Sequence, residues 1–290
     1  MEEALSSNSH QKVPLFGLGI AGNFAGHLQQ TGEANALQGA VDASRPQALF
    51  PFFVPNATEP YLAVNSYSFD TVLLPSDVNA KVQMEPEIAL VVTVKYLGTS
   101  VIGLVPESMT LLNDLTHRNA VVSKLAEKKN WGMASKGIAP NAWPLSSFSA
   151  ADGLGKYRFC SFHARDGRWA ACGHDVSLSD YSYCYEQLIS WLIERINQQK
   201  NEGALHSIAA LLAEAGFPKR MLISLGSSRY TDYGEQHHLL AGDALCAVLY
   251  DSSRIDLSQV TELVKTEQFD ALNQHHIVLS QRCFAKGDSD

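Results

Sequence analysis

The stretch VQMEPEIALVVTV, residues 82–94, joins two glutamates to an apolar run. The run IALVVTV predicts a buried strand, because it is short, apolar and rich in β-branched residues. Glu85 and Glu87 are two residues apart, so both carboxylates point to the same side of an extended chain. Pro86 cannot donate a ladder hydrogen bond, which places the pair at a strand start or a sheet edge. Two like charges held there require either water or a positive charge between them.

Short apolar segments separated by turn residues make up most of the remaining chain, which predicts an α+β protein that is mainly β. Two segments with helical periodicity, residues 185–199 and 205–216, interrupt this pattern. The second ends at Gly216, with Pro218 just beyond it. The other expected elements are strands at 88–94, 100–106, 220–226 and 243–251, an edge strand or wall at 48–56, a hairpin at 158–173, a polar and helical piece after the glycine-rich start of residues 13–40, and a helix around Val121, Val122 and Leu125.

Composition narrows the class of protein. The chain has 290 residues, 46% hydrophobic and 18% charged, enough to bury one large core or two smaller ones. A net charge of −8 without a basic block argues against nucleic acid or an anionic membrane as the main partner. Five cysteines without a CxxC motif favour a reducing, cytoplasmic compartment. The polar N-terminus lacks a secretory signal, and no apolar run is long enough to cross a bilayer.

A third acid strengthens the case for a metal. An isolated Glu-x-Glu pair is more often a solvated strand end, but Asp114 follows an apolar pair in LLNDLTHR. Three hard oxygen donors without clustered cysteines suit Mg²⁺ or Mn²⁺, and leave octahedral positions for water and substrate. A divalent cation would also remove the repulsion between Glu85 and Glu87. The sequence therefore predicts one divalent cation bound to these three acids.

Several motifs together resemble the fumarylacetoacetate hydrolase family. EPEIAL (85–90), NDLTHR (113–118) and the pair Lys136-Gly137 after Trp131 follow one another in the order and spacing of that family's ExE, ND-x-[ST]-x-R and lysine–glycine segments. The ExE and ND-x-[ST]-x-R combination is the specific part. Weaker matches are collinear with these and extend the resemblance over residues 15–250: GNFAGH (22–27), ARDGRWAACGHDV (164–176), LISLGSS (222–228) and LLAGDALCAVL (239–249).

The resemblance implies a mixed β-roll or sandwich with peripheral helices, in which an N-terminal lid segment (1–45) precedes a catalytic domain (46–290). It implies a homodimer with one divalent metal per site, held here by Glu85, Glu87 and Asp114. Substrates of the family are small 2-oxo or 1,3-dioxo acids, which chelate the metal through adjacent oxygens.

Further residues gain roles from the same resemblance. Arg118 and Lys136 match basic positions that bind a substrate carboxylate or a developing oxyanion, and are expected to face the same cavity as the acids. Ser227 matches a substrate-binding threonine, although a turn serine is the plainer interpretation. His27 matches a lid histidine that forms a water-activating dyad with a glutamate three residues later. Gln30 stands at that glutamate position, so Glu33 is the candidate replacement.

Two further departures indicate a divergent branch. Phe52 and Phe53 stand where the family has a lysine, and residues 197–220 form an insertion. Three functions remain open. The first is a hydrolase that cleaves a C–C bond in an acylpyruvate or 1,3-dioxo acid. The second is a hydratase, decarboxylase or tautomerase of a 2-oxo acid on the same metal site. The third is a non-catalytic binding protein that kept the metal pocket.

Overall fold

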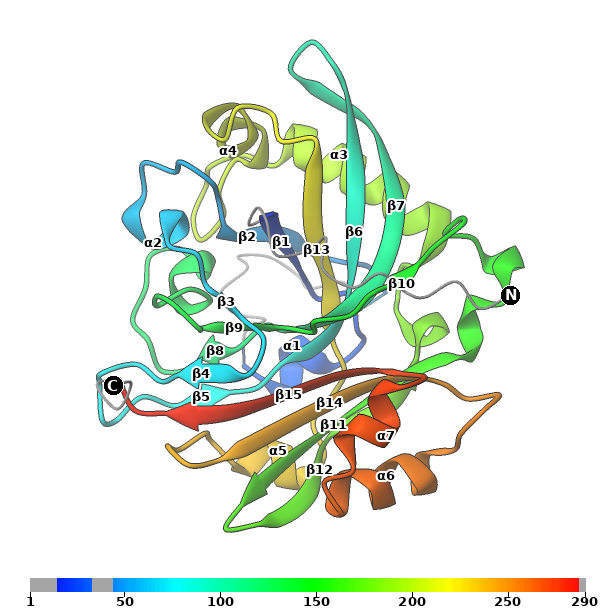
Figure 1. Ribbon diagram of the computed structural model, residues 1–290. Helices are drawn as coiled ribbons and strands as arrows, with labels where there is room; N and C mark the ends of the chain where they lie inside the picture. Colours follow the sequence, from blue (N-terminus) through cyan, green and yellow to red (C-terminus); the bar gives the residue numbers. More distant parts are fainter. Residues whose placement is uncertain (1–14, 33–43, 287–290) are drawn as a thin grey trace.

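The computed structural model describes residues 15–32 and 44–286, and two β-sheets dominate it (Figure 1). The larger sheet has eight strands, and its central strands run antiparallel except for the parallel pair of β1 and β13. Its strands, in spatial order, are β2 (Ala48–Phe53), β1 (Phe16–Ala21), β13 (Arg220–Ser227), β6 (Pro86–Leu97), β7 (Ser100–Asn113), β9 (Lys136–Ile138) and β3 (Tyr67–Ser68), with β10 (Trp143–Pro144) pairing to β7.

The second sheet has five strands and lies against the lower part of the first in Figure 1. Its order is β12 (Arg168–Ser177), β11 (Tyr157–Arg165), β14 (Ala244–Asp251), β15 (Ile277–Phe284) and β4 (Thr71–Leu73). A two-stranded sheet pairs β5 (Val82–Gln83) with β8 (Thr116–His117). The α-helices are α1 (His27–Gln30), α2 (Pro60–Ala63), α3 (Tyr185–Gln198), α4 (Ile208–Glu214), α5 (Asp232–Gln236), α6 (Leu257–Lys265) and α7 (Phe269–Asn273).

A single large core joins the two sheets. Apolar residues of β1, β6, β7 and β13 pack in one cluster with residues of β11, β14 and β15 and with the buried face of α3. The packing of α3 explains its amphipathic sequence. Leu188, Leu192 and Ile196 recur at intervals of four, so they lie on one face of the helix, and all three are fully buried. Among the described residues, no helix is long and apolar enough to span a bilayer. The fold is α+β and mainly β, as the sequence predicts.

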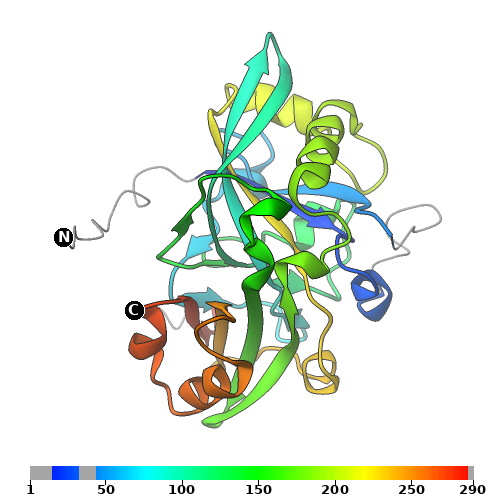
Figure 2. The same ribbon diagram turned by 90° about the vertical axis from the view of Figure 1, so that its right-hand side faces the viewer.

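The long hairpin of β6 and β7 positions the acids. Its two strands protrude together from the larger sheet at the top of Figures 1 and 2. At the opposite end, the antiparallel register pairs Pro86 with Asn113 and Glu87 with Leu112. Residues that enter β6 therefore lie beside residues that leave β7, and Pro86 stands at the strand start, where it costs no ladder hydrogen bond.

The segment 197–220 covers an open edge of the larger sheet. Strand β2 is the edge strand, as expected for 48–56, and an exposed edge invites pairing with another chain. The Gln199 side chain accepts a hydrogen bond from the Leu49 amide (2.9 Å) and donates one to its carbonyl (2.8 Å). The helix α4 then packs on this side through Ile208, Leu211 and Leu212. The insertion therefore protects the sheet edge.

Most expected elements are present, and one is wrong. The hairpin at 158–173 forms from β11 and β12, with Asp166 (φ 52°) and Gly167 (φ 71°) in the turn. The helix expected around Val121 and Leu125 does not form. Val121 is fully exposed, and the only regular element there is a 3₁₀ turn at Leu125–Lys128. The helix expected after the glycine-rich start is reduced to α1 within the described residues, and the remainder, 33–43, lies outside them.

Candidate metal centre

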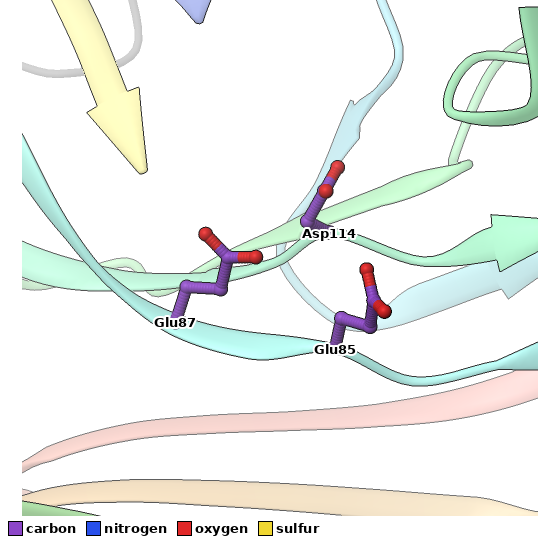
Figure 3. Close-up of side chains that lie close together, drawn as sticks. All are labelled: Glu85, Glu87 and Asp114. Carbon is purple, nitrogen blue, oxygen red and sulfur yellow. The ribbon is translucent and has the colours of Figure 1, made fainter. Parts of the chain in front are cut away.

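Three carboxylates converge at the end of the β6–β7 hairpin. Glu87 lies in β6 and Glu85 directly precedes it, their side chains project to the same side of the ribbon, and Asp114 lies beside them in the segment after β7 (Figure 3). One oxygen from each side chain can be chosen so that all three lie within 4.8 Å of one another. All three residues are buried, with exposed fractions of 2%, 3% and 0%. We refer to Glu85, Glu87 and Asp114 as the acidic triad, and the described chain has no other such cluster of metal-ligating groups.

Backbone and amide contacts hold the triad in place. The Asp114 amide donates to the Glu85 carbonyl (2.8 Å), and the Asn113 side chain accepts from the Glu85 amide (2.9 Å). On the other side, β13 ends beside β6, and the Gly226 amide donates to Glu87 Oε2 (2.8 Å). Gly226 has φ 107°, a conformation that L side chains rarely adopt. The carboxylates are therefore fixed by the ends of three neighbouring strands.

The pKa values of Glu85 and Glu87 are shifted in opposite directions. Burial raises the pKa of Glu85, but the charges of Arg118 and Lys129 and a contact from His27 outweigh it, so its pKa lies well below the ordinary value. Burial and the neighbouring charges of Asp114 and Glu85 raise the pKa of Glu87 well above the ordinary value, against the opposing charge of Lys129. Glu87 therefore carries the unrelieved repulsion within the triad.

Arg118 supports the triad from one side. Its guanidinium forms an ion pair with Glu85 and donates to Gln83 Oε1 (2.8 Å) and to the Tyr230 hydroxyl (3.0 Å). The Tyr230 hydroxyl in turn donates to the Met84 carbonyl (2.7 Å). Tyr230 was not predicted, because a tyrosine three residues after a strand end gives no signal in a single sequence.

Lys136 contacts Asp114 of the triad. It is fully buried, with Nζ 3.0 Å from Asp114 Oδ1 and donating to the Leu115 carbonyl (2.8 Å). Burial lowers its pKa to about 8, although Asp114 opposes the shift. Arg118 and Lys136 both touch the acids, yet neither is among the residues that line the adjoining cavity. Their ammonium and guanidinium groups are held by protein atoms at the back of the site.

A second lysine, which sequence reasoning missed, lies inside the triad. Lys129 Nζ forms ion pairs with Glu85 and with Asp114 Oδ2 (2.6 Å for the latter). It also lies 4.9 Å from the centre of the Phe50 ring. In the sequence Lys129 stands in the charged segment AEKKN, which is typical of a solvated surface. Only the packing of the loop turns it inward.

The short helix α1 lies beside the triad and brings His27 to it. His27 is buried, and its Nε2 lies 3.1 Å from Glu85 Oε1. Gln30 points elsewhere: its amide nitrogen donates to the Tyr230 carbonyl (3.0 Å), and its oxygen accepts from the Tyr230 amide (2.8 Å). Glu33 lies outside the described residues, so the replacement dyad with His27 stays a prediction.

A small, partly open cavity adjoins these groups. Ser227 lies on its wall, so the predicted substrate-binding serine is at the cavity. The aromatic wall is provided by Phe50, whereas the sequence placed Phe52 and Phe53 there; neither of these two lines the cavity. Its remaining lining combines charged and apolar side chains: His27, Glu85, Glu87 and Lys129 with Ile20, Ala21, Phe24, Leu28 and Leu125, beside Gly22, Asn23 and Gly226.

Comparison with known sequences identifies the family. Residues 36–283 match the family described as "Family of unknown function (DUF5718)", and the chain belongs to this family. No curated protein matches the sequence. The family assignment therefore carries no activity of its own.

Comparison with solved structures identifies the fold. A 2-keto-3-deoxyarabinonate dehydratase superposes with a TM-score of 0.56 at 14% identity, covering 94% of this chain and 75% of the dehydratase. The protein Cg1458, solved with an inhibitor, gives a TM-score of 0.52 at 15% identity, covering 94% and 78% of the two chains. At these identities the likeness shows the fold alone, and the fold expected from the sequence motifs is confirmed.

Proposed function

We propose that this protein is an enzyme that binds one divalent cation, Mg²⁺ or Mn²⁺, at the acidic triad and transforms a small 2-oxo acid there. The observation that carries the proposal is the convergence of three buried carboxylates beside a cavity. Three buried acids are costly for folding, and the opposite pKa shifts of Glu85 and Glu87 within one cluster are characteristic of functional sites.

The residues present fit a hard divalent cation. Glu85, Glu87 and Asp114 offer only oxygen donors. Burial and then the charges of Asp114 and Glu85 raise the pKa of Glu87, and a cation would relieve the repulsion among these charges. A cation bound there would act as a Lewis acid toward the two adjacent oxygens of a 2-oxo acid. The fold resemblance to a 2-keto acid dehydratase supports the same class of substrate.

Protein groups around the cavity supply binding and proton transfer. Ser227 presents a hydroxyl group to the cavity, where it would bind a substrate oxygen. His27 reaches both the cavity and Glu85, and its Nδ1 has no hydrogen-bond partner among the described residues, so the ring is placed to move a proton. The wall formed by Phe50, Leu28 and Leu125 excludes water from this side.

The position of Gln30 favours dehydration, decarboxylation or tautomerisation over hydrolysis. Hydrolysis of a C–C bond requires an activated water, and an imidazole does this best beside a carboxylate. Gln30 carries no charge, and its amide is engaged with the Tyr230 backbone. Dehydration, decarboxylation and tautomerisation add no water to the substrate, so none of them needs this dyad.

Hydrolysis of an acylpyruvate or 1,3-dioxo acid is the second candidate, which the sequence motif NDLTHR favours. It requires Glu33 to reach His27 when the lid segment (1–45) closes over the catalytic domain. Changing Glu33→Gln would then abolish hydrolysis, while a dehydratase or tautomerase reaction would be unaffected.

The metal is tested before the substrate. We expect Mn²⁺ to bind the wild-type protein with a stoichiometry of one, measured by calorimetry, and Glu87→Gln to abolish that binding. A panel of 2-oxo and 1,3-dioxo acids, assayed with Mg²⁺ and with Mn²⁺, then identifies the reaction from its products. Metal binding that survives in Glu87→Gln would place the cation elsewhere and refute the proposed centre.

A further inference from the structure

Lys129 occupies the position between two of the three acids. Its Nζ contacts one oxygen of Glu85 and one of Asp114, and the residue is buried. Among the residues that line the cavity, it is the lysine that also contacts the triad. An ammonium group in this position neutralises the cluster and fills the space between the carboxylates.

Every oxygen of Glu85 and Asp114 lies near a basic group, although Asp114 Oδ1 has no hydrogen-bond partner among the described residues. Glu85 Oε1 meets Arg118 and His27, and Glu85 Oε2 meets Lys129 and the Thr116 hydroxyl (2.8 Å). Asp114 Oδ1 is 3.0 Å from Lys136, and Oδ2 is 2.6 Å from Lys129. A divalent cation bound at roughly 2.0–2.6 Å from Glu85 and Asp114 would lie close to the Lys129 ammonium and repel it strongly.

One movement would release an oxygen on each of the two acids. Arg118 is tied to Gln83 and Tyr230, and Lys136 to the Leu115 and Ser135 carbonyls. Lys129 lines the cavity, and rotation of its side chain would carry Nζ toward it. The backbone need not move.

The loop beside Lys129 is anchored independently. The next residue, Asn130, donates to the Phe52 carbonyl (2.8 Å) and accepts from the Gly132 amide (3.0 Å). Leu125 at the start of the 3₁₀ turn donates to the Ala204 carbonyl (2.9 Å). Movement of the ammonium would therefore leave the loop intact.

We propose that Lys129 is a displaceable internal counter-ion: it holds Glu85 and Asp114 together in the metal-free protein, and a divalent cation drives its ammonium into the cavity. This inference rests on the proposed metal centre. It has two consequences. Lys129 lowers the affinity for the cation, and once displaced it presents a positive charge beside Phe50 to an anionic substrate.

The first test measures metal affinity without any substrate. Mn²⁺ binding is measured by calorimetry for the wild-type protein, Lys129→Met and Lys129→Gln. Glutamine can still donate hydrogen bonds to the two acids, so it preserves folding if methionine does not. We expect both variants to bind Mn²⁺ at least about tenfold more tightly than wild type, because a repelling charge is removed. The control is Lys95→Met, which removes an exposed lysine from β6 and should leave the affinity unchanged.

The second test follows the ammonium in the unaltered protein. Reductive methylation with formaldehyde and a borane, read by peptide mass spectrometry, reports the accessibility of each lysine. We expect modification of Lys129 to be slow without metal and to rise several-fold with saturating Mn²⁺, while exposed Lys95 stays constant. Unchanged labelling of Lys129 would overturn the displacement.

The outcomes separate the two proposals. If the wild type and both variants fail to bind Mn²⁺, the metal centre and the displacement fall together. If all bind Mn²⁺ with equal affinity, the metal centre stands and the displacement is wrong. Weaker binding in both variants would show that Lys129 supports the cation, which also overturns the inference. Tight binding in the variants with none in the wild type would show that the cation cannot displace Lys129 in the unaltered protein, which overturns the displacement.

Discussion

Two clusters in this protein bury carboxylates, and they differ in how far the surrounding groups compensate for the cost of burial. In the second sheet, Asp243 is a single carboxylate surrounded by donors. Arg165 donates to both of its oxygens (2.9 and 2.8 Å), His163 Nε2 lies 2.9 Å from Oδ2, and the Leu240 amide donates to Oδ2 (2.7 Å). The acidic triad instead places three carboxylates within reach of one another.

The pKa shifts express this difference. Burial raises the pKa of Asp243, but the hydrogen bonds from Arg165, His163 and the Leu240 amide outweigh it, so its pKa is strongly lowered. In the triad Glu85 is shifted downward, whereas burial and like charges shift Glu87 upward. A buried carboxylate with enough hydrogen-bond donors stabilises the fold. A buried carboxylate beside other carboxylates does not, which indicates a functional role. The contrast distinguishes a structural ion cluster from a candidate active site without reference to any relative.

The largest expected effect removes the structural cluster. Asp243→Ala leaves buried His163 and the Arg165 guanidinium without their common partner, so we expect the free energy of unfolding to fall by about 3 kcal/mol. Chemical denaturation measures the loss. Binding of Mn²⁺ at 10 °C, where the variant remains folded, should match wild type. A loss of metal binding with intact stability would reverse the roles that we assign to the two clusters.

The opposite result is expected in the triad. With metal removed by a chelator, Glu87→Gln replaces a crowded acid by a neutral group that still accepts from the Gly226 amide. We expect the free energy of unfolding to rise or to change by less than about 1 kcal/mol. The stabilisation of wild type by added Mn²⁺, read as a shift in Tm, should vanish in the variant. The matched control, Glu107→Gln at a half-exposed pair with Arg220, should keep the Mn²⁺ shift.

Local patterns account for what the sequence predicted correctly. The apolar, β-branched run IALVVTV, the ARDGR turn and the periodicity of Leu188, Leu192 and Ile196 are each set within a dozen residues. The spacing of Glu85 and Glu87 placed both on one face of a strand, and Asp114 joined them because β6 and β7 are antiparallel neighbours. A single sequence is enough to predict these features, because local backbone geometry determines them.

Long-range packing explains what was missed. Lys129 stands among charged residues in the sequence. Nothing local shows that its ammonium is buried against Asp114 and Glu85, which lie 15 and 44 positions earlier in the chain. Tyr230 reaches Arg118 over a separation of 112 residues. The failed helix after NDLTHR has the same origin, since its apolar residue Val121 faces solvent while Leu125 is buried. Partners of a buried charge are chosen in three dimensions, and the sequence shows only the charge.

The two clusters should also respond oppositely to pH. The lowered pKa of Asp243 means that its stabilisation is complete above the unfolded-state value of about 3.9 and is lost as the pH falls further. The difference between wild type and Asp243→Asn should therefore shrink below about pH 4. The raised pKa of Glu87 has the reverse sign: in a chelator, wild type loses stability as the pH rises above about 4.3, so the relative stability of Glu87→Gln should grow upward from there. Denaturation curves between pH 3 and 7 test both trends, and parallel curves would contradict the contrast.

The smallest effect concerns the helix α1, which brings His27 to the triad and has no counterpart at Asp243. Gln30 joins this helix to the Tyr230 backbone through one accepted and one donated hydrogen bond, and also donates to Glu235 (3.1 Å). Gln30→Glu keeps the acceptor but loses both donors and sets a carboxylate beside Glu235. We expect a loss of about 1 kcal/mol in the free energy of unfolding and no gain in turnover.

The neighbouring Gln29→Glu is the matched control, because Gln29 is exposed on the same helix and should tolerate the change. In the related enzymes that the sequence resembles, a glutamate at position 30 would strengthen His27 as a base, so the two expectations oppose each other. If Gln30→Glu gained hydrolytic activity, the carboxylate must have left Tyr230 and turned toward His27. That result would mean that α1 can rotate on the triad, and that the Gln30 amide suppresses hydrolysis in this protein. If the variant is only less stable, the amide serves to hold α1 in place, and the reaction proceeds without a histidine–glutamate dyad at this position.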